Sequence, residues 1–162
     1  MIKAIIFDLD NTLLDFVKMK QFSVKAAITA MNEAGLEVDE KKAYEDIFDL
    51  YMERGWENQQ VFDDYLNQTV GEVSNKILAA GIVSYRRARE ATLLVYPNVN
   101  KTIIQLIKMG INLAVVSDAP SREAWMRLYY LNLHHVFDPV LTFDDTGVRK
   151  PSPKPFQMAL DY

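Results

Sequence analysis

The pattern of apolar residues along the chain predicts three short strands. Residues 2–7 form a nearly continuous apolar run rich in isoleucine, and residues 111–116 repeat this pattern. Such runs are typical of strands that are buried on both faces of a parallel sheet. A weaker run at residues 140–143 predicts a third strand.

The long stretch between the first two predicted strands has the periodicity of amphipathic helices. Its apolar residues recur at the three- and four-residue spacing of a helix face. This spacing predicts one helix that ends near Gly35 and a second that ends near Gly55. A third helix is predicted to begin near Asn58, and a longer one to run through Val73 towards Leu94.

Further helices are predicted over residues 102–109 and 121–131, on either side of the second strand. Alternation of strand, helix and strand implies a parallel α/β sheet with right-handed crossovers. We therefore expect an α/β core formed by residues 1–15 and 93–162. Residues 16–92 are predicted to form a helical insertion in this core.

The C-terminal residues predict one more helix. Ser152 is a suitable N-cap, and Pro153 fits the first helical position. No stop signal follows before Tyr162. We expect the chain to end inside this helix, which would leave the α/β core incomplete at its C-terminus.

Composition narrows the class of protein. The 162 residues are 49% apolar and 25% charged, as in ordinary globular domains. No run approaches the roughly 18–20 apolar residues that span a bilayer, and the N-terminus lacks a secretory signal, so a cytoplasmic protein without a membrane partner is expected. The lack of cysteine excludes disulfides, zinc–thiolate sites and thiol nucleophiles. A net charge of −4 gives no general reason to bind nucleic acid.

Two carboxylates, Asp8 and Asp10, lie where the first predicted strand ends. Ligands of parallel α/β sheets gather beyond the carboxyl ends of the strands. Two acids this close repel each other unless a cation or a shared proton offsets the repulsion. Mg²⁺ prefers such oxygens and leaves its other positions to water and phosphate. The pair is therefore a candidate magnesium site.

Two further polar segments are candidate phosphate ligands. Ser117 and Asp118 follow the second predicted strand directly, where a hydroxyl and backbone N–H groups can bind phosphate oxygens. Lys150 precedes two prolines and the last predicted helix, where its charge could neutralise an anion or a carboxylate nucleophile. Each signal alone is also typical of an ordinary turn or surface loop.

Together these segments resemble the first three motifs of the haloacid dehalogenase superfamily, in the same order. Asp8-Leu9-Asp10-Asn11-Thr12 is similar to the first motif, Ser117 to the second, and Lys150-Pro151-Ser152-Pro153 to the third. The resemblance implies a Rossmann-like core with a C1-type α-helical cap over residues 16–92. It also implies a phosphatase rather than a dehalogenase, because an acid at position 10 can protonate an alkoxide, whereas a halide leaving group needs no proton.

The resemblance implies roles for the matching residues. Asp8 attacks phosphorus and forms an aspartyl-phosphate. Asp10 protonates the leaving alcohol and then activates water. Lys150 offsets negative charge on Asp8 and the phosphate, and Mg²⁺ is held by the Asp8 carboxylate and the backbone carbonyl of Asp10. The residues implied to bind the phosphoryl group of a small phosphorylated metabolite are Thr12, Ser117 and Asp118.

The fourth motif of the superfamily, a pair of acids that completes the metal site, has no match before Tyr162. Asp144 and Asp145 precede Lys150 and are predicted to lie in a solvated loop instead. With no later strand beside it, the strand over residues 2–7 is expected to have an unpaired edge. Such an edge favours self-association of the chain.

Two other functions stay open from the sequence. A phosphomutase or a phosphonate hydrolase of the same superfamily would use the same motifs; the first transfers phosphate to sugar, and the second needs a Schiff-base lysine from its cap. A non-catalytic binding or regulatory fragment is favoured by the missing fourth motif. It is opposed by the residues that do match, namely Asp8, Asp10, Thr12, Ser117 and Lys150.

Overall fold

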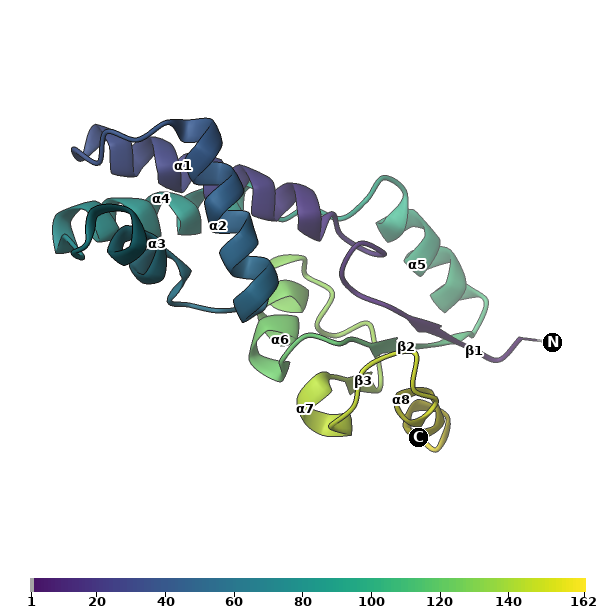
Figure 1. Cartoon of the computed structure of the whole chain (residues 1–162). Coiled ribbons are helices and arrows are strands. Elements are labelled where there is room, and N and C mark those ends of the chain that lie inside the picture. Colours follow the sequence, from purple (N-terminus) through teal and green to yellow (C-terminus); the bar gives the residue numbers. More distant parts are fainter. Residues whose placement is uncertain (1) are drawn as a thin grey trace. The chain divides into compact units, whose positions relative to one another are not determined.

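The chain forms two compact units in a computed structural model that describes residues 2–162 (Figure 1). One unit consists of the residues up to Phe16 together with Leu93–Tyr162, and the other of Val17–Thr92. Each unit has its own core. The helical segment thus interrupts the α/β unit in sequence, between Phe16 and Leu93.

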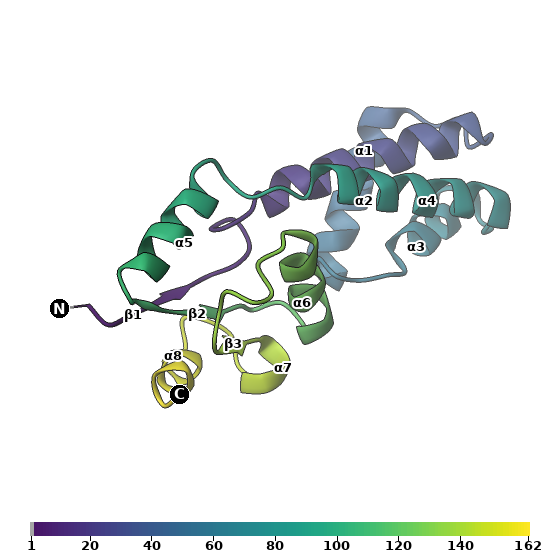
Figure 2. The same cartoon turned by 180° about the vertical axis from the view of Figure 1, so that it is seen from behind.

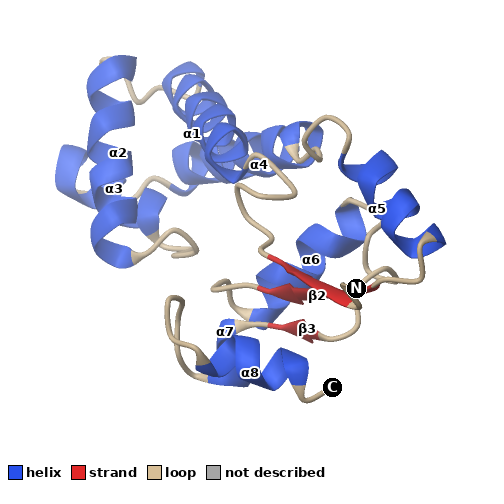
Figure 3. Cartoon of the chain, turned by 90° about the vertical axis from the view of Figure 1, so that its right-hand side faces the viewer, coloured by secondary structure: helices blue, strands red, loops and turns tan. Residues whose placement is uncertain are grey.

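The α/β unit is built on a parallel sheet of three strands. They are β1 (Ala4–Phe7), β2 (Asn112–Val116) and β3 (Val140–Leu141), in the spatial order β1-β2-β3. Ile5 pairs with Leu113 in the first ladder, and Val115 pairs with Val140 in the second. Figure 3 shows the three strands side by side. The α/β class and the parallel sheet expected from the sequence are confirmed.

Four helices belong to the α/β unit. They are α5 (Val99–Lys108), α6 (Ser121–Tyr130), α7 (Phe143–Thr146) and α8 (Lys154–Leu160). Helix α5 leads into β2, and α6 connects β2 to β3. Figures 1 and 2 both show α5 and α8 on opposite sides of the sheet. Between the sheet and α8, a buried cluster is formed by Val116, Leu141 and Ala159, and Ile6 and Met158 pack against it.

The helical unit contains α1 (Phe16–Glu33), α2 (Glu40–Arg54), α3 (Val61–Val70) and α4 (Asn75–Thr92), of which Phe16 lies in the α/β unit. Asp39 caps α2, since its carboxylate accepts a hydrogen bond from the Lys42 N–H at 2.8 Å. The apolar faces of α1, α2 and α3 meet in one buried core, and partly buried residues of α4 pack against it. The buried core includes Val24, Ile28, Met31, Ile47, Leu50, Val61, Phe62 and Leu66. Within residues 2–162, none of the helices is both long and apolar enough to cross a membrane.

The prediction for the first strand was wrong in its burial. β1 begins at Ala4 rather than Ile2, and Ala4 is exposed while Ile5, Ile6 and Phe7 are only half-buried. The reason is the place of β1 at the edge of the sheet, where one side has no neighbouring strand among the described residues. β2, in the centre, is buried as expected over residues 113–116.

The third predicted strand is also shorter, because it ends at Leu141 and Phe143 begins α7. Thr142 and Asp145 form a capping box at the start of this helix, with the Thr142 N–H 2.8 Å from a carboxylate oxygen of Asp145. Asp144 accepts a hydrogen bond from the Ser121 N–H at 2.7 Å. Both acids are exposed, as predicted, but they lie in a short helix and bind backbone N–H groups, so the prediction of a loop was wrong.

The last predicted helix begins and ends at other residues than expected. α8 starts at Lys154, with Pro153 in the N-cap position and Ser152 outside the helix. It ends at Leu160, so the chain does not end inside a helix. In the helical unit, α4 starts at Asn75 and thus excludes Val73.

Candidate active site

Asp8 follows β1 directly and leads into a tight turn. The Leu13 N–H donates to the Leu9 carbonyl at 3.0 Å, and Asn11 takes a positive φ of 59°, which asparagine adopts more readily than most residues. The turn brings the chain back on itself. As a result, the Thr12 hydroxyl donates a hydrogen bond of 3.0 Å to Oδ2 of Asp8.

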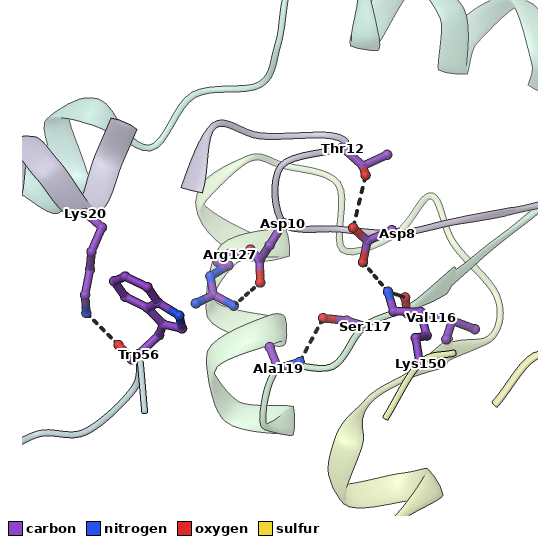
Figure 4. Close-up of polar contacts among 10 residues, drawn as sticks. All are labelled: Asp8, Asp10, Thr12, Lys20, Trp56, Val116, Ser117, Ala119, Arg127 and Lys150. Atoms are coloured by element: carbon purple, nitrogen blue, oxygen red, sulfur yellow. Dashed lines mark hydrogen bonds and ion pairs between the residues drawn. The ribbon is translucent and has the colours of Figure 1, made fainter. Parts of the chain in front are cut away.

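Lys150 approaches Asp8 from the other side, out of the segment between α7 and α8 (Figure 4). Its ammonium group donates to Oδ1 of Asp8 and, at 2.9 Å, to the carbonyl oxygen of Val116 at the end of β2. The Lys150 backbone N–H donates to Oδ1 of Asp118 at 3.0 Å. The lysine is therefore held at both its backbone and its side chain.

Ser117 lies at the same edge of the sheet but contacts neither Asp8 nor Lys150 in the hydrogen bonds of the structure. It is buried, with 4% of its surface exposed, and its hydroxyl accepts a bond from the Ala119 N–H at 3.1 Å. The backbone N–H of Ser117 donates to the Leu141 carbonyl at 2.9 Å. These bonds fix the turn that follows β2.

Asp10 takes part in a different contact from Asp8. Its Oδ2 lies 2.9 Å from Nη1 of Arg127, a residue of α6. The Arg127 side chain is 7% exposed and the Asp10 side chain 24%. Figure 4 shows the Asp10–Arg127 pair and the Asp8–Lys150 pair as two separate contacts on the same side of the turn.

The structure thus connects most of the residues that the sequence singled out. Asp8, Thr12 and Lys150 are directly bonded, and Asp118 joins them through the Lys150 backbone. Arg127 was missed by sequence reasoning. The sequence offered one indication of its burial, namely its helical spacing from Glu123 and Leu128. The structure shows that these residues lie on the buried face of α6.

The oxygens at this edge fit a small hard cation. Within residues 2–162 there is no group of three or more His, Cys, Asp or Glu side chains placed to hold a metal ion. Mg²⁺ needs no such cage, because one or two carboxylates with water and phosphate oxygens complete its six positions. The Asp8 side chain is 37% exposed, which leaves room for such ligands beside it. The donor set is compatible with Mg²⁺ and poor for zinc or copper.

A carboxylate fixed by a hydroxyl and a lysine thus lies at the carboxyl edge of a parallel sheet, where ligands of α/β proteins bind. The family comparison agrees: residues 2–162 match the model of the haloacid dehalogenase-like hydrolases. The chain belongs to this family. It is a phosphatase of the family, as the relatives described next also are by name.

Two similar proteins are named glyceraldehyde 3-phosphate phosphatase. The one from Methanothermobacter thermautotrophicus is 33% identical over 160 residues, which cover 99% of this chain and 71% of the relative. The one from Methanopyrus kandleri is 37% identical over 158 residues, which cover 96% of this chain and 68% of the relative.

A solved structure with a similar fold is the HAD-hydrolase YfnB from Bacillus subtilis, described as bound to magnesium. Its TM-score is 0.62 at 19% identity, with 99% of this chain and 72% of that chain covered. At this identity the similarity supports the fold alone. It agrees with the α/β class and the added helical unit.

Proposed function

We propose that this chain hydrolyses phosphate monoesters of small metabolites through a phosphoryl group carried on Asp8. The observation that carries the proposal is the Asp8 carboxylate fixed between the Thr12 hydroxyl and the Lys150 ammonium. A nucleophile must be held in one orientation to attack in line, and both partners hold this one. The Thr12 bond belongs to the local turn after β1, whereas Lys150 is 142 residues from Asp8 in sequence, so the contact of Asp8 with Lys150 is a product of the fold.

In the first step, a carboxylate oxygen of Asp8 attacks phosphorus, and the bond between phosphorus and the ester oxygen breaks. The leaving alkoxide takes a proton from the carboxyl group of Asp10. Charge on the transferring phosphoryl oxygens is offset by Lys150, while Thr12, Ser117 and neighbouring N–H groups orient them. Asp118 contributes by holding the backbone of Lys150.

In the second step, water attacks the phosphorus of the aspartyl-phosphate and gives its proton to the Asp10 carboxylate. The bond between phosphorus and the Asp8 oxygen breaks, which releases inorganic phosphate and restores the Asp8 carboxylate and the protonated carboxyl group of Asp10. Two displacements through an acyl-phosphate intermediate replace one direct attack of water on the phosphate ester. Asp10 therefore acts as acid and then as base.

The Asp8 carboxylate and the backbone carbonyl of Asp10 would hold Mg²⁺. When bound, this cation offsets charge on the phosphoryl oxygens and orients them for in-line displacement. Support comes from the oxygen donors at this edge of the sheet, which suit a small hard cation.

For the substrate, we propose a three-carbon sugar phosphate, with glyceraldehyde 3-phosphate as the first compound to assay. The two relatives above carry this activity in their names and are similar over nearly the whole chain. The unit Val17–Thr92 would serve as a helical cap that selects the leaving group, while the residues up to Phe16 and Leu93–Tyr162 would form the catalytic core.

The test is release of inorganic phosphate from glyceraldehyde 3-phosphate and from an aryl phosphate, with Mg²⁺ and with a chelator. Asp8→Asn is the matched control, because it keeps the size of the side chain and removes the nucleophile. Magnesium-dependent release that is lost in Asp8→Asn is expected. Release that persists in Asp8→Asn, or transfer of phosphate to sugar without release, would overturn the proposal.

A further inference from the structure

Helix α6 carries an arginine on its buried face. Arg127 is 5% exposed and lies next to Leu128, which is fully buried, and one turn after Ala124, which is also buried. A guanidinium stays charged at any pH that a protein tolerates. Burying it is unfavourable unless it is paired and hydrogen-bonded. The position therefore calls for a hydrogen-bond acceptor, which a carboxyl group supplies whether it is ionised or protonated.

The partner is Asp10, at 2.9 Å from Nη1 of Arg127. The flat guanidinium also lies over the ring of Phe16, with its central carbon 4.7 Å from the ring centroid. Phe16 is itself buried, with 8% of its surface exposed. Arg127 is thus packed against a fixed ring while it contacts the carboxylate, which limits the positions that the carboxylate can take.

We propose that Arg127 is a positioning residue that holds Asp10 in the orientation in which it exchanges a proton with the leaving group. The inference rests on the proposed function, in which Asp10 is the acid and base. Arg127 touches neither the substrate nor the transferring phosphoryl group in this proposal, because its side chain is 7% exposed. The Asp10 side chain is 24% exposed as a whole while its Oδ1 atom is buried, so a bound substrate would have to reach Asp10 beside the Arg127 contact.

A positioning role has a consequence that a purely structural ion pair lacks. Proton donation to the leaving oxygen matters greatly when the leaving group is an alkoxide and little when it is a stabilised aryl oxide. Misplacing Asp10 should therefore slow an alkyl phosphate far more than an aryl phosphate. A pair that only stabilises the fold would slow both substrates by the same factor.

The experiment compares Arg127→Met and Arg127→Lys on glycerol phosphate and on nitrophenyl phosphate. For Arg127→Met, kcat should fall about 10²-fold on the alkyl ester and only a few-fold on the aryl ester, since general acid catalysis is worth about 10²–10⁴. Arg127→Lys keeps the charge but loses the planar fork, so its selectivity should be intermediate. Arg122→Met, at an exposed arginine of the same helix, is the control and should leave both rates unchanged.

A double variant separates positioning from every other effect. In an Asp10→Asn background, Arg127→Met should cause no further loss on the alkyl ester, because the group that it positions no longer transfers a proton. Equal losses of Arg127→Met on both esters, or a full additional loss in the Asp10→Asn background, would overturn the inference. If Arg127→Met does not fold, equal losses of Arg127→Lys on both esters would overturn it in the same way.

Failure of this inference can be told apart from failure of the proposed function. If Asp8→Asn retains turnover of the aryl phosphate, the proposed function fails first. If Asp8→Asn abolishes turnover while the Arg127 variants show no leaving-group selectivity, only the role of Arg127 fails.

Discussion

At the scale of single residues, the site depends on how Lys150 is held. Its ammonium group has two acceptors, the Asp8 carboxylate and the Val116 carbonyl, and its backbone N–H has a third in Asp118. A lysine side chain is flexible when it is free, so these contacts remove rotamer entropy before a substrate arrives. The positive charge is thus in place beside the nucleophile in advance, as electrostatic stabilisation of a transition state requires.

Replacing Lys150 by methionine should lower kcat by about 10²–10³-fold, because one preorganised stabiliser of developing charge is lost. Steady-state kinetics on an aryl phosphate measure the change. Arg149→Met is the matched control, since Arg149 is exposed and its guanidinium lies over the Phe143 ring instead of the site. A loss in Arg149→Met as large as that in Lys150→Met would count against the assigned role.

At the scale of elements, the helical unit is held together by a buried lysine on α1. Lys20 is 4% exposed, and its ammonium group donates to the Trp56 carbonyl at 2.6 Å and to the Tyr85 hydroxyl at 2.7 Å (Figure 4 shows the first). It also lies 3.8 Å from the centroid of the Tyr51 ring. α1 is therefore tied to α2, to α4 and to the loop before α3 through one charged group.

Lys20→Ala should lower the free energy of unfolding by about 1–3 kcal/mol, since it removes a buried ammonium group that donates to the Trp56 carbonyl and the Tyr85 hydroxyl. Urea unfolding of the whole chain measures this, with Lys18→Ala as the control at an exposed position of the same helix. Equal stability of the Lys20→Ala and Lys18→Ala proteins would show that the contacts contribute nothing.

Tyr51 and Tyr85, the two tyrosines that contact Lys20, predict that the protein loses stability at high pH. Burial raises the pKa of Tyr51 to about 12, and burial also raises the pKa of Tyr85. Both pKa values exceed the ordinary value of 10.0, so the folded state keeps protons that the unfolded state has lost. This contribution to stability is complete below pH 10 and is lost as the pH rises towards the folded-state pKa values.

Urea unfolding between pH 9 and about 12 tests this dependence, because the unfolded state binds fewer protons in that window. Tyr51→Phe and Tyr85→Phe should each reduce the slope of stability against pH. An unchanged slope in both variants would contradict the account.

Element positions could largely be predicted from the sequence, whereas their partners could not. Helical periodicity located α1 and α2 because each buries one apolar stripe. It did not predict that Lys20 and Arg127 are buried. A charged side chain can be buried only where residues distant in sequence supply its partners, and periodicity does not report those partners. The unpaired edge of β1 was expected, but its half-burial was missed, since the apolar run alone predicted a strand buried on both faces.

The sequence singled out residues that the structure brings together, but it did not give the hydrogen bonds between them. Asp8, Thr12 and Lys150 follow from residue type and order along the chain. The tie between the Lys150 backbone and Asp118 depends on the path of the segment between α7 and α8. No local sequence pattern specifies that path.

At the scale of the whole molecule, the edge of the sheet at β1 is the feature most relevant to assembly. β1 pairs only with β2 among residues 2–162, and Ala4 is exposed. Exposed backbone groups on an edge strand can pair with another chain. Self-association through this edge stays a prediction.

Sedimentation velocity over a range of concentrations should detect this self-association. Ala4→Lys should reduce it, because a lysine on an edge strand disfavours pairing between chains. Leu94→Lys is the control, since Leu94 is an apolar residue of the same unit with 66% exposure that lies outside the sheet. A wild-type chain that sediments as a monomer at all concentrations would rule the edge out as an interface.

The central claim is that Asp8 carries the phosphoryl group, and borohydride trapping of the intermediate tests it most directly. An aryl phosphate would be mixed with Mg²⁺ and the Asp10→Asn variant, in which the second step is slowed and the first needs little proton donation. Borohydride reduces an acyl phosphate to an alcohol, and peptide mass spectrometry then locates it. The account predicts reduction at position 8 alone. Release of phosphate with no reduction at Asp8, or with reduction at another carboxylate, would contradict it.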